Sequence, residues 1–70
     1  MEKPVKPGLF IVRVQNNLTR EQLSVKANVS TRTIYKAEKG QPIRLMVAYR
    51  LCQALGIDLS DIDIQIVEQQ

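Results

Sequence analysis

A cluster of hydrogen-bond donors lies in the middle of this 70-residue chain. Residues 26–40 read KANVSTRTIYKAEKG and carry four basic residues against a single acid, Glu38. If residues 31–39 form a helix, one of its sides presents a hydroxyl, a guanidinium, a phenol and two amines, while Ile34 and Ala37 face the other way. The donors are Thr31, Arg32, Tyr35, Lys36 and Lys39. Such a row of donors suits the base edges and phosphates of a nucleic acid.

The composition excludes most enzyme chemistry. The sequence contains one cysteine and no histidine, so it cannot form an internal disulfide, a Cys/His zinc site or a Ser-His-Asp triad. We therefore expect no enzyme activity, no catalytic residue, no metal and no cofactor. No apolar run approaches the roughly 20 residues that span a bilayer, and no signal peptide is recognisable, so we expect no membrane association.

Basic and acidic residues are unevenly distributed along the chain. The formal net charge is only +3, but residues 20–44 contain six basic residues and two acids, whereas residues 57–70 contain four acids and no base. A small domain with a basic segment and an acidic end is typical of a protein that directs one surface toward a polyanion. The alternative is a basic face that is merely solvated.

Two helices are marked by their capping residues. Thr19 followed by Gln22 is a capping box, which predicts a helix over about residues 20–26. Ser30 is a second N-cap and predicts a helix over residues 31–39. Both helices are therefore expected to begin at well-defined positions.

The predicted turn between these helices is short. It consists of three residues, among which Asn28 tolerates a positive φ better than most side chains. Gly40 is placed to end the second helix with a left-handed cap. Two helices joined in this way form a helix-turn-helix, whose second helix can lie in the DNA major groove.

The flanking segments are less uniform. Apolar residues recur at helical spacing over residues 45–55 and predict another helix, and Asp58 is placed to cap a last short turn. Residues 62–66 alternate isoleucine with polar residues, which favours a strand. At the other end residues 1–8 look like an irregular, flexible arm, while residues 9–17 fit either a helix or a strand.

The run LTREQLSVKANVSTRTIYKAEKG, followed by ALGI, resembles the helix-turn-helix of the lambda repressor and Cro superfamily, also called XRE-type regulators. The resemblance covers residues 9–63 as one domain and rests on motifs that are specific in combination. It implies an all-α fold, a compact bundle of five short helices, to which the tail (residues 64–70) adds a short β-strand at most. It also implies a cytoplasmic protein of prokaryotic or phage type that binds double-stranded DNA.

The resemblance also implies roles for individual residues. The base-reading positions of the family are matched by Thr31, Arg32, Tyr35 and Lys36. The backbone-contacting positions are matched by Thr19, Arg20, Lys39, Gln41 and Arg44. Glu38 matches an acid on the inner side of the second helix that pairs with an arginine of the first helix, here Arg13. A buried acid needs such a partner, so the pair is structural and would make residues 9–14 helical. Asn28 and Gly40 are structural as well.

Apolar residues on the first helix are left without a partner. Phe10, Ile11 and Val14 occupy positions that are usually charged in this family. Together with the alternating tail they predict a homodimer, with the tail as an added strand between subunits. The expected dimer interface contains Phe10, Val14, Ile64 and Ile66. The alternative is that the tail folds back over its own first helix.

These features favour a sequence-specific DNA-binding transcriptional regulator, a repressor, that uses helix 31–39 in the major groove. A second function fits the apolar surface instead. In that alternative the protein is an antitoxin or adaptor whose main role is to bind another protein through Phe10, Val14 and residues 62–66.

Overall fold

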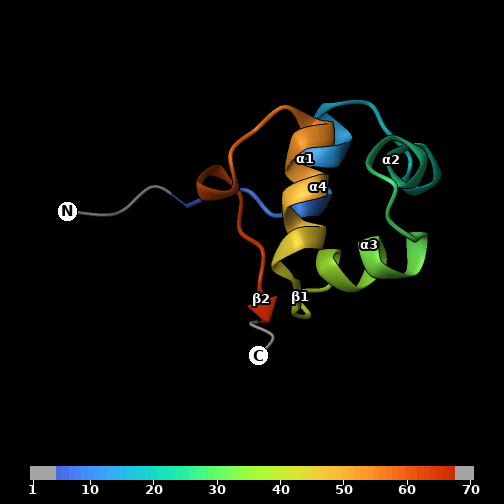
Figure 1. Ribbon diagram of the computed structural model, residues 1–70. Helices are drawn as coiled ribbons and strands as arrows, with labels where there is room; N and C mark the ends of the chain where they lie inside the picture. Colours follow the sequence, from blue (N-terminus) through green and yellow to red (C-terminus); the bar gives the residue numbers. More distant parts are fainter. Residues whose placement is uncertain (1–4, 68–70) are drawn as a thin grey trace.

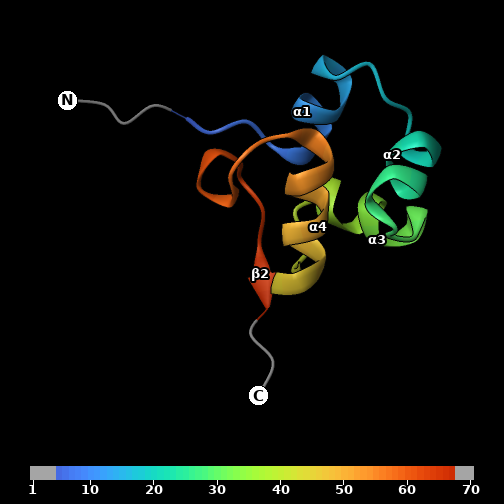
Figure 2. The same ribbon diagram turned by 45° about the horizontal axis from the view of Figure 1, so that its top comes forward.

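The computed structural model describes residues 5–67 and is mostly helical (Figures 1 and 2). The elements are α1 (Leu9–Gln15), α2 (Arg20–Ala27), α3 (Thr31–Glu38), β1 (Ile43–Arg44), α4 (Leu45–Leu55), a 3-10 turn (Leu59–Asp61) and β2 (Ile66–Val67). Residues 1–4 of the predicted arm and residues 68–70 of the predicted tail lie outside the described residues. Within the described range, every helix is too short or too polar to cross a membrane.

The prediction of five helices is not confirmed, because residues 5–67 contain four α-helices. The expected fifth helix is the 3-10 turn, and Asp58 at its N-cap makes no side-chain capping hydrogen bond, contrary to prediction. Instead the Asp61 amide donates to the Asp58 carbonyl at 2.9 Å. The turn cannot extend into a helix because the chain after it is extended, and the Asp63 amide donates to the Pro7 carbonyl at 2.8 Å.

The predicted C-terminal strand is present as β2, which pairs in parallel with β1 of the same chain. Ile43 lies opposite Ile66 and Arg44 opposite Val67, and the Ile43 amide donates to the Gln65 carbonyl at 3.0 Å. Figures 1 and 2 show β2 beside β1 at the N-terminal end of α4, away from α1. The tail therefore does not fold back over the first helix.

The first apolar segment is a helix, α1, and not a strand. Its inner face buries Leu9, Val12 and Arg13, the three residues that the helical interpretation placed on one side. The helix ends at a residue that the sequence analysis did not single out: Asn17 has a φ of 58°. The Leu18 amide then donates to the Arg13 carbonyl at 3.2 Å, which closes the helix end.

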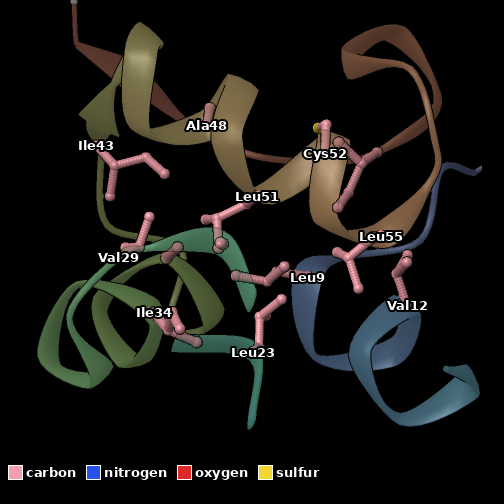
Figure 3. Close-up of a cluster of buried hydrophobic side chains, with 13 residues drawn as sticks. Leu9, Val12, Leu23, Val29, Ile34, Ile43, Ala48, Leu51, Cys52 and Leu55 are labelled. Carbon is pink, nitrogen blue, oxygen red and sulfur yellow. The ribbon is translucent and has the colours of Figure 1, made fainter. Parts of the chain in front are cut away.

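The core draws side chains from all four helices (Figure 3). Leu9 of α1, Leu23 of α2, Ile34 of α3 and Leu51 of α4 are each at most 1% exposed. Complete burial of a side chain of this size contributes about 1.5 to 3 kcal/mol. The four helices are thus held in fixed positions, and so are the side chains on their outer faces.

Candidate nucleic-acid interface

One face of α3 lies in the core and the other faces solvent. Ile34 and Ala37 are 0% and 5% exposed and anchor the helix. At its start the Ser30 hydroxyl accepts from the Thr33 amide at 3.2 Å, which confirms the predicted N-cap. The opposite face is exposed and carries the predicted base-reading residues Thr31, Arg32, Tyr35 and Lys36. The division of this helix into two faces is as predicted.

The turn between α2 and α3 determines where that face points. Asn28 has φ 57° and ψ 48°, the left-handed conformation predicted for it. The next residue, Val29, is 7% exposed, and its amide donates to the Ser24 carbonyl at 3.1 Å. A backbone hydrogen bond and an apolar contact therefore close the turn, and α2 and α3 form one rigid unit.

The C-terminal end of α3 has the predicted glycine cap. Gly40 has a φ of 86°, its amide donates to the Ala37 carbonyl at 3.1 Å, and the Gln41 amide donates to the Lys36 carbonyl at 3.0 Å. These two bonds form a Schellman motif, which reverses the chain direction. Gln41 and Arg44, two of the predicted backbone-contacting residues, are exposed directly after this reversal.

Thr19 caps α2 as predicted. Its hydroxyl oxygen accepts from the Gln22 amide at 3.0 Å, while the Gln22 side-chain oxygen accepts from the Thr19 amide at 2.9 Å. A hydroxyl that accepts one hydrogen bond keeps its own hydrogen to donate. Thr19 can therefore serve the helix and still donate to a phosphate oxygen.

The ion pair between Arg13 of α1 and Glu38 of α3 is confirmed. Arg13 Nε donates to Glu38 Oε2 at 2.5 Å, and the two side chains are 9% and 4% exposed. Arg13 Nη1 also donates to the Leu18 carbonyl at 2.8 Å. Both charged groups are satisfied in the interior, so Glu38 belongs to the scaffold and faces away from the basic surface.

A second arginine, which the sequence analysis missed, shares the carboxylate of Glu38. Arg20 Nε donates to Glu38 Oε1 at 2.9 Å, and the Arg20 side chain is 40% exposed. Arg20 Cζ lies 4.9 Å from the centroid of the Tyr35 ring, and Lys39 Nζ lies 5.2 Å from the same centroid. One signal pointed to this pairing: Arg20 is the first residue of α2, where the helix dipole disfavours a cation unless an acid lies nearby.

The predicted DNA-contacting cations border two separate hollows of the surface. A shallow depression at the start of α2 and α3 is lined by Arg20, Glu21, Thr31, Arg32 and Tyr35. A pocket between α3 and β1 has Thr33, Lys36 and Arg44 in its lining. The structure thus brings Arg20 close to Arg32, and Lys36 close to Arg44, with α3 contributing to both hollows.

The residues predicted for the dimer interface lie on different elements. Phe10 and Val14 are each 49% exposed on α1. Ile64 and Ile66 are only partly exposed and pack against the core of their own chain. The tail is thus partly used within the chain, and the dimer interface stays a prediction.

Cys52 is a buried core residue, 2% exposed. Burial, and to a smaller extent the negative charge of Asp58, raises the pKa of the Cys52 thiol. The thiol is therefore protonated and unreactive at neutral pH. Across residues 5–67 no group of three or more histidine, cysteine or acidic side chains is placed to hold a metal ion.

Two capped helices joined through a left-handed residue, the second with a buried inner face and a basic outer face, define the helix-turn-helix class of DNA-binding domains. A family model described as helix-turn-helix matches residues 9–62. The chain belongs to this family, the XRE-type, lambda repressor/Cro-like helix-turn-helix domains, as the sequence motifs implied. No curated protein and no solved structure matches the chain.

Proposed function

We propose that this protein is a sequence-specific transcriptional repressor that acts in the cytoplasm of a prokaryotic or phage-infected cell by inserting α3 into the DNA major groove. The observation that carries the proposal is the exposed face of α3, which presents Thr31, Arg32 and Lys36 while the opposite face is fixed in the core. The family to which the chain belongs is one of DNA-binding domains, which supports a role in transcription.

Arg32 is the residue best suited to read a base. Its guanidinium can bind the O6 and N7 atoms of guanine together, and such a contact gives about 1 to 3 kcal/mol of discrimination. Lys36 can donate to a guanine or a phosphate, and Thr31 can offer its methyl group to thymine. Sequence preference is therefore concentrated on the first two turns of α3.

Residues around this face are suited to hold the DNA backbone. Arg20, Lys39 and Arg44 supply positive charge, and the Thr19 hydroxyl and Gln41 amide supply donors. Each phosphate contact lowers the slope of log K against log salt by about 0.9. Three such cations per subunit then predict a slope of about −2.7 for one subunit and about −5.4 for two.

Selection of bound sites from random duplex DNA tests the proposal directly. We expect a defined consensus, and we expect Arg32→Ala to weaken binding to that consensus by about 1 to 3 kcal/mol while leaving binding to unrelated DNA nearly unchanged. Arg50→Ala is the matched control, because Arg50 is an exposed arginine on α4 that the proposed interface does not include. A selection that yields no consensus, or a salt slope near zero, would contradict the proposal.

We also propose that the DNA-binding species is a homodimer. A single module buries only about 600 to 1,000 Å² on DNA, which gives little selectivity, whereas two modules related by a dyad read half-sites about 34 Å apart. The half-exposed side chains of Phe10 and Val14 offer apolar surface for such contacts. The dimer predicts a palindromic consensus, and sedimentation as a monomer at high micromolar concentration would argue against it.

The same apolar surface supports a second candidate function. Phe10, Ile11 and Val14 are between 47% and 49% exposed on one short helix, and an antitoxin or adaptor would use them to bind a different protein. A stoichiometric heterologous partner after affinity purification, lost in Phe10→Asp, would favour this function. A homogeneous dimer with no second polypeptide would favour the repressor.

A further inference from the structure

Arg20 occupies a position that helix stability does not explain. It is the first residue of α2, where the exposed amides of the helix carry partial positive charge and a cation is unfavourable. An acid or a neutral polar residue would suit this position better. The structure offsets the conflict with the carboxylate of Glu38, which is already paired with Arg13.

The guanidinium of Arg20 is held from two directions. Glu38 Oε1 accepts from Nε at 2.9 Å, and the Tyr35 ring lies 4.9 Å from Cζ, within the range of a cation–π contact. Nε is therefore occupied and the plane of the group is set against the ring. Within the described part of the chain, the two terminal amino groups make no hydrogen bond, and the side chain is 40% exposed.

Tyr35, predicted to read a base, is also engaged within the protein. Two cations lie over its ring, since Lys39 Nζ is 5.2 Å from the centroid in addition to Arg20 Cζ. Tyr35 and Arg20 line the same shallow depression, with Thr31 and Arg32 at its other side. The amino groups of Arg20 thus lie at the border of a hollow that is open to solvent and rich in donors.

We propose that Tyr35 and Glu38 are positioning residues that hold the guanidinium of Arg20 so that its two terminal amino groups bind one DNA phosphate. A guanidinium matches two phosphate oxygens with two parallel hydrogen bonds. A side chain already held in the required orientation loses less entropy on binding. Tyr35 acts through Arg20 and not on a base. This inference rests on the proposed DNA-binding function.

A double-mutant cycle on the selected duplex tests the proposal. At 0.1 M salt, loss of one phosphate contact corresponds to about an eightfold weaker affinity, and to a salt slope less steep by about 0.9, which is the result expected for Arg20→Ala. Tyr35→Leu removes the ring but keeps a good helix former. We expect it to weaken binding about three- to eightfold in the parent protein, and less than twofold when Arg20 is already alanine.

Two conservative variants separate position from charge and from stability. Tyr35→Phe keeps the ring, so we expect binding within about twofold of the parent protein. Arg20→Lys keeps the charge but has no Nε to donate to Glu38, and we expect a loss of about fourfold or more. Melting temperatures are recorded for every variant, because a purely structural effect would lower stability without changing the salt slope.

The outcomes distinguish this inference from the proposed function. If the parent protein binds no duplex DNA, the proposed function fails and the inference fails with it. If the parent protein binds DNA but Tyr35→Leu has the same effect in both backgrounds, Tyr35 acts independently of Arg20 and only the inference is overturned. Equal binding by the parent protein and Arg20→Lys would overturn it as well, because charge alone would then suffice.

Discussion

Glu38→Gln is the substitution that most directly tests how the scaffold is held together. Glu38 joins three helices, since it lies on α3 and accepts from Arg13 of α1 and from Arg20 of α2. Glutamine keeps the shape of the side chain and one acceptor oxygen but removes the negative charge. It also turns an amide group toward a guanidinium, where two donors face each other.

The size of the effect follows from the burial of each partner. The side chains of Arg13 and Glu38 are 9% and 4% exposed, and breaking a buried pair from one side destabilises a protein by about 3 to 5 kcal/mol. Arg20 is 40% exposed, so solvent screens its share, which adds no more than about 1 kcal/mol. Because glutamine retains one acceptor, we expect a loss of about 3 kcal/mol.

A loss of about 3 kcal/mol is large for a domain of this size. A chain of 70 residues has a total stability of roughly 4 to 10 kcal/mol. In small domains each kcal/mol lowers the melting temperature by about 4 to 8 °C, so we expect Glu38→Gln to lower it by about 12 to 24 °C. Thermal and urea denaturation followed by circular dichroism measure both quantities.

Two comparisons show whether the lost charge is the cause. Glu21→Gln makes the same chemical change at an exposed position in the first turn of α2 and should alter stability by less than about 1 kcal/mol. The pair Arg13→Met with Glu38→Leu leaves no unpaired charge between α1 and α3 and should be more stable than Glu38→Gln. A melting temperature for Glu38→Gln within about 3 °C of the parent protein would refute the reasoning.

Two further predictions concern the turn and the core. At Asn28, where φ is 57°, glycine should change stability by less than about 1 kcal/mol and valine should lower it by about 1 to 2 kcal/mol, measured by urea denaturation. Burial raises the pKa of the Cys52 thiol above its ordinary value of 9.0. The unfolded chain therefore loses this proton first, and the associated stability is complete below about pH 9 and declines above it. Comparing the urea midpoints of the parent protein and Cys52→Ala at pH 8 and pH 10 checks this sign.

The parts of the fold that could be predicted are those governed by local chemistry. The caps at Thr19 and Ser30 depend on residues three positions apart in the sequence, and the left-handed turn depends on the tolerance of one asparagine. The ion pair between Arg13 and Glu38 is not local. It was predicted because the family resemblance places an arginine opposite that acid.

The missed features depend on contacts between distant residues. Alternation over residues 62–66 predicted a strand but could not indicate that β1, separated from it by the whole of α4, would be its partner. The same limit applies to Arg20, whose carboxylate partner was already assigned to another arginine. Its unfavourable position at a helix N-terminus was visible in the sequence, but only the packing of α2 against α3 shows how the conflict is resolved.

The parallel pairing of β1 and β2 makes the loop after α3 depend on the far end of the described chain. Arg44 lies in β1, so the backbone that carries this cation is ordered partly by hydrogen bonds to the tail. Any binding event that draws β2 into another sheet would remove those bonds and increase the conformational entropy of the loop. Occupancy of the tail and affinity of the α3 surface are thereby thermodynamically linked.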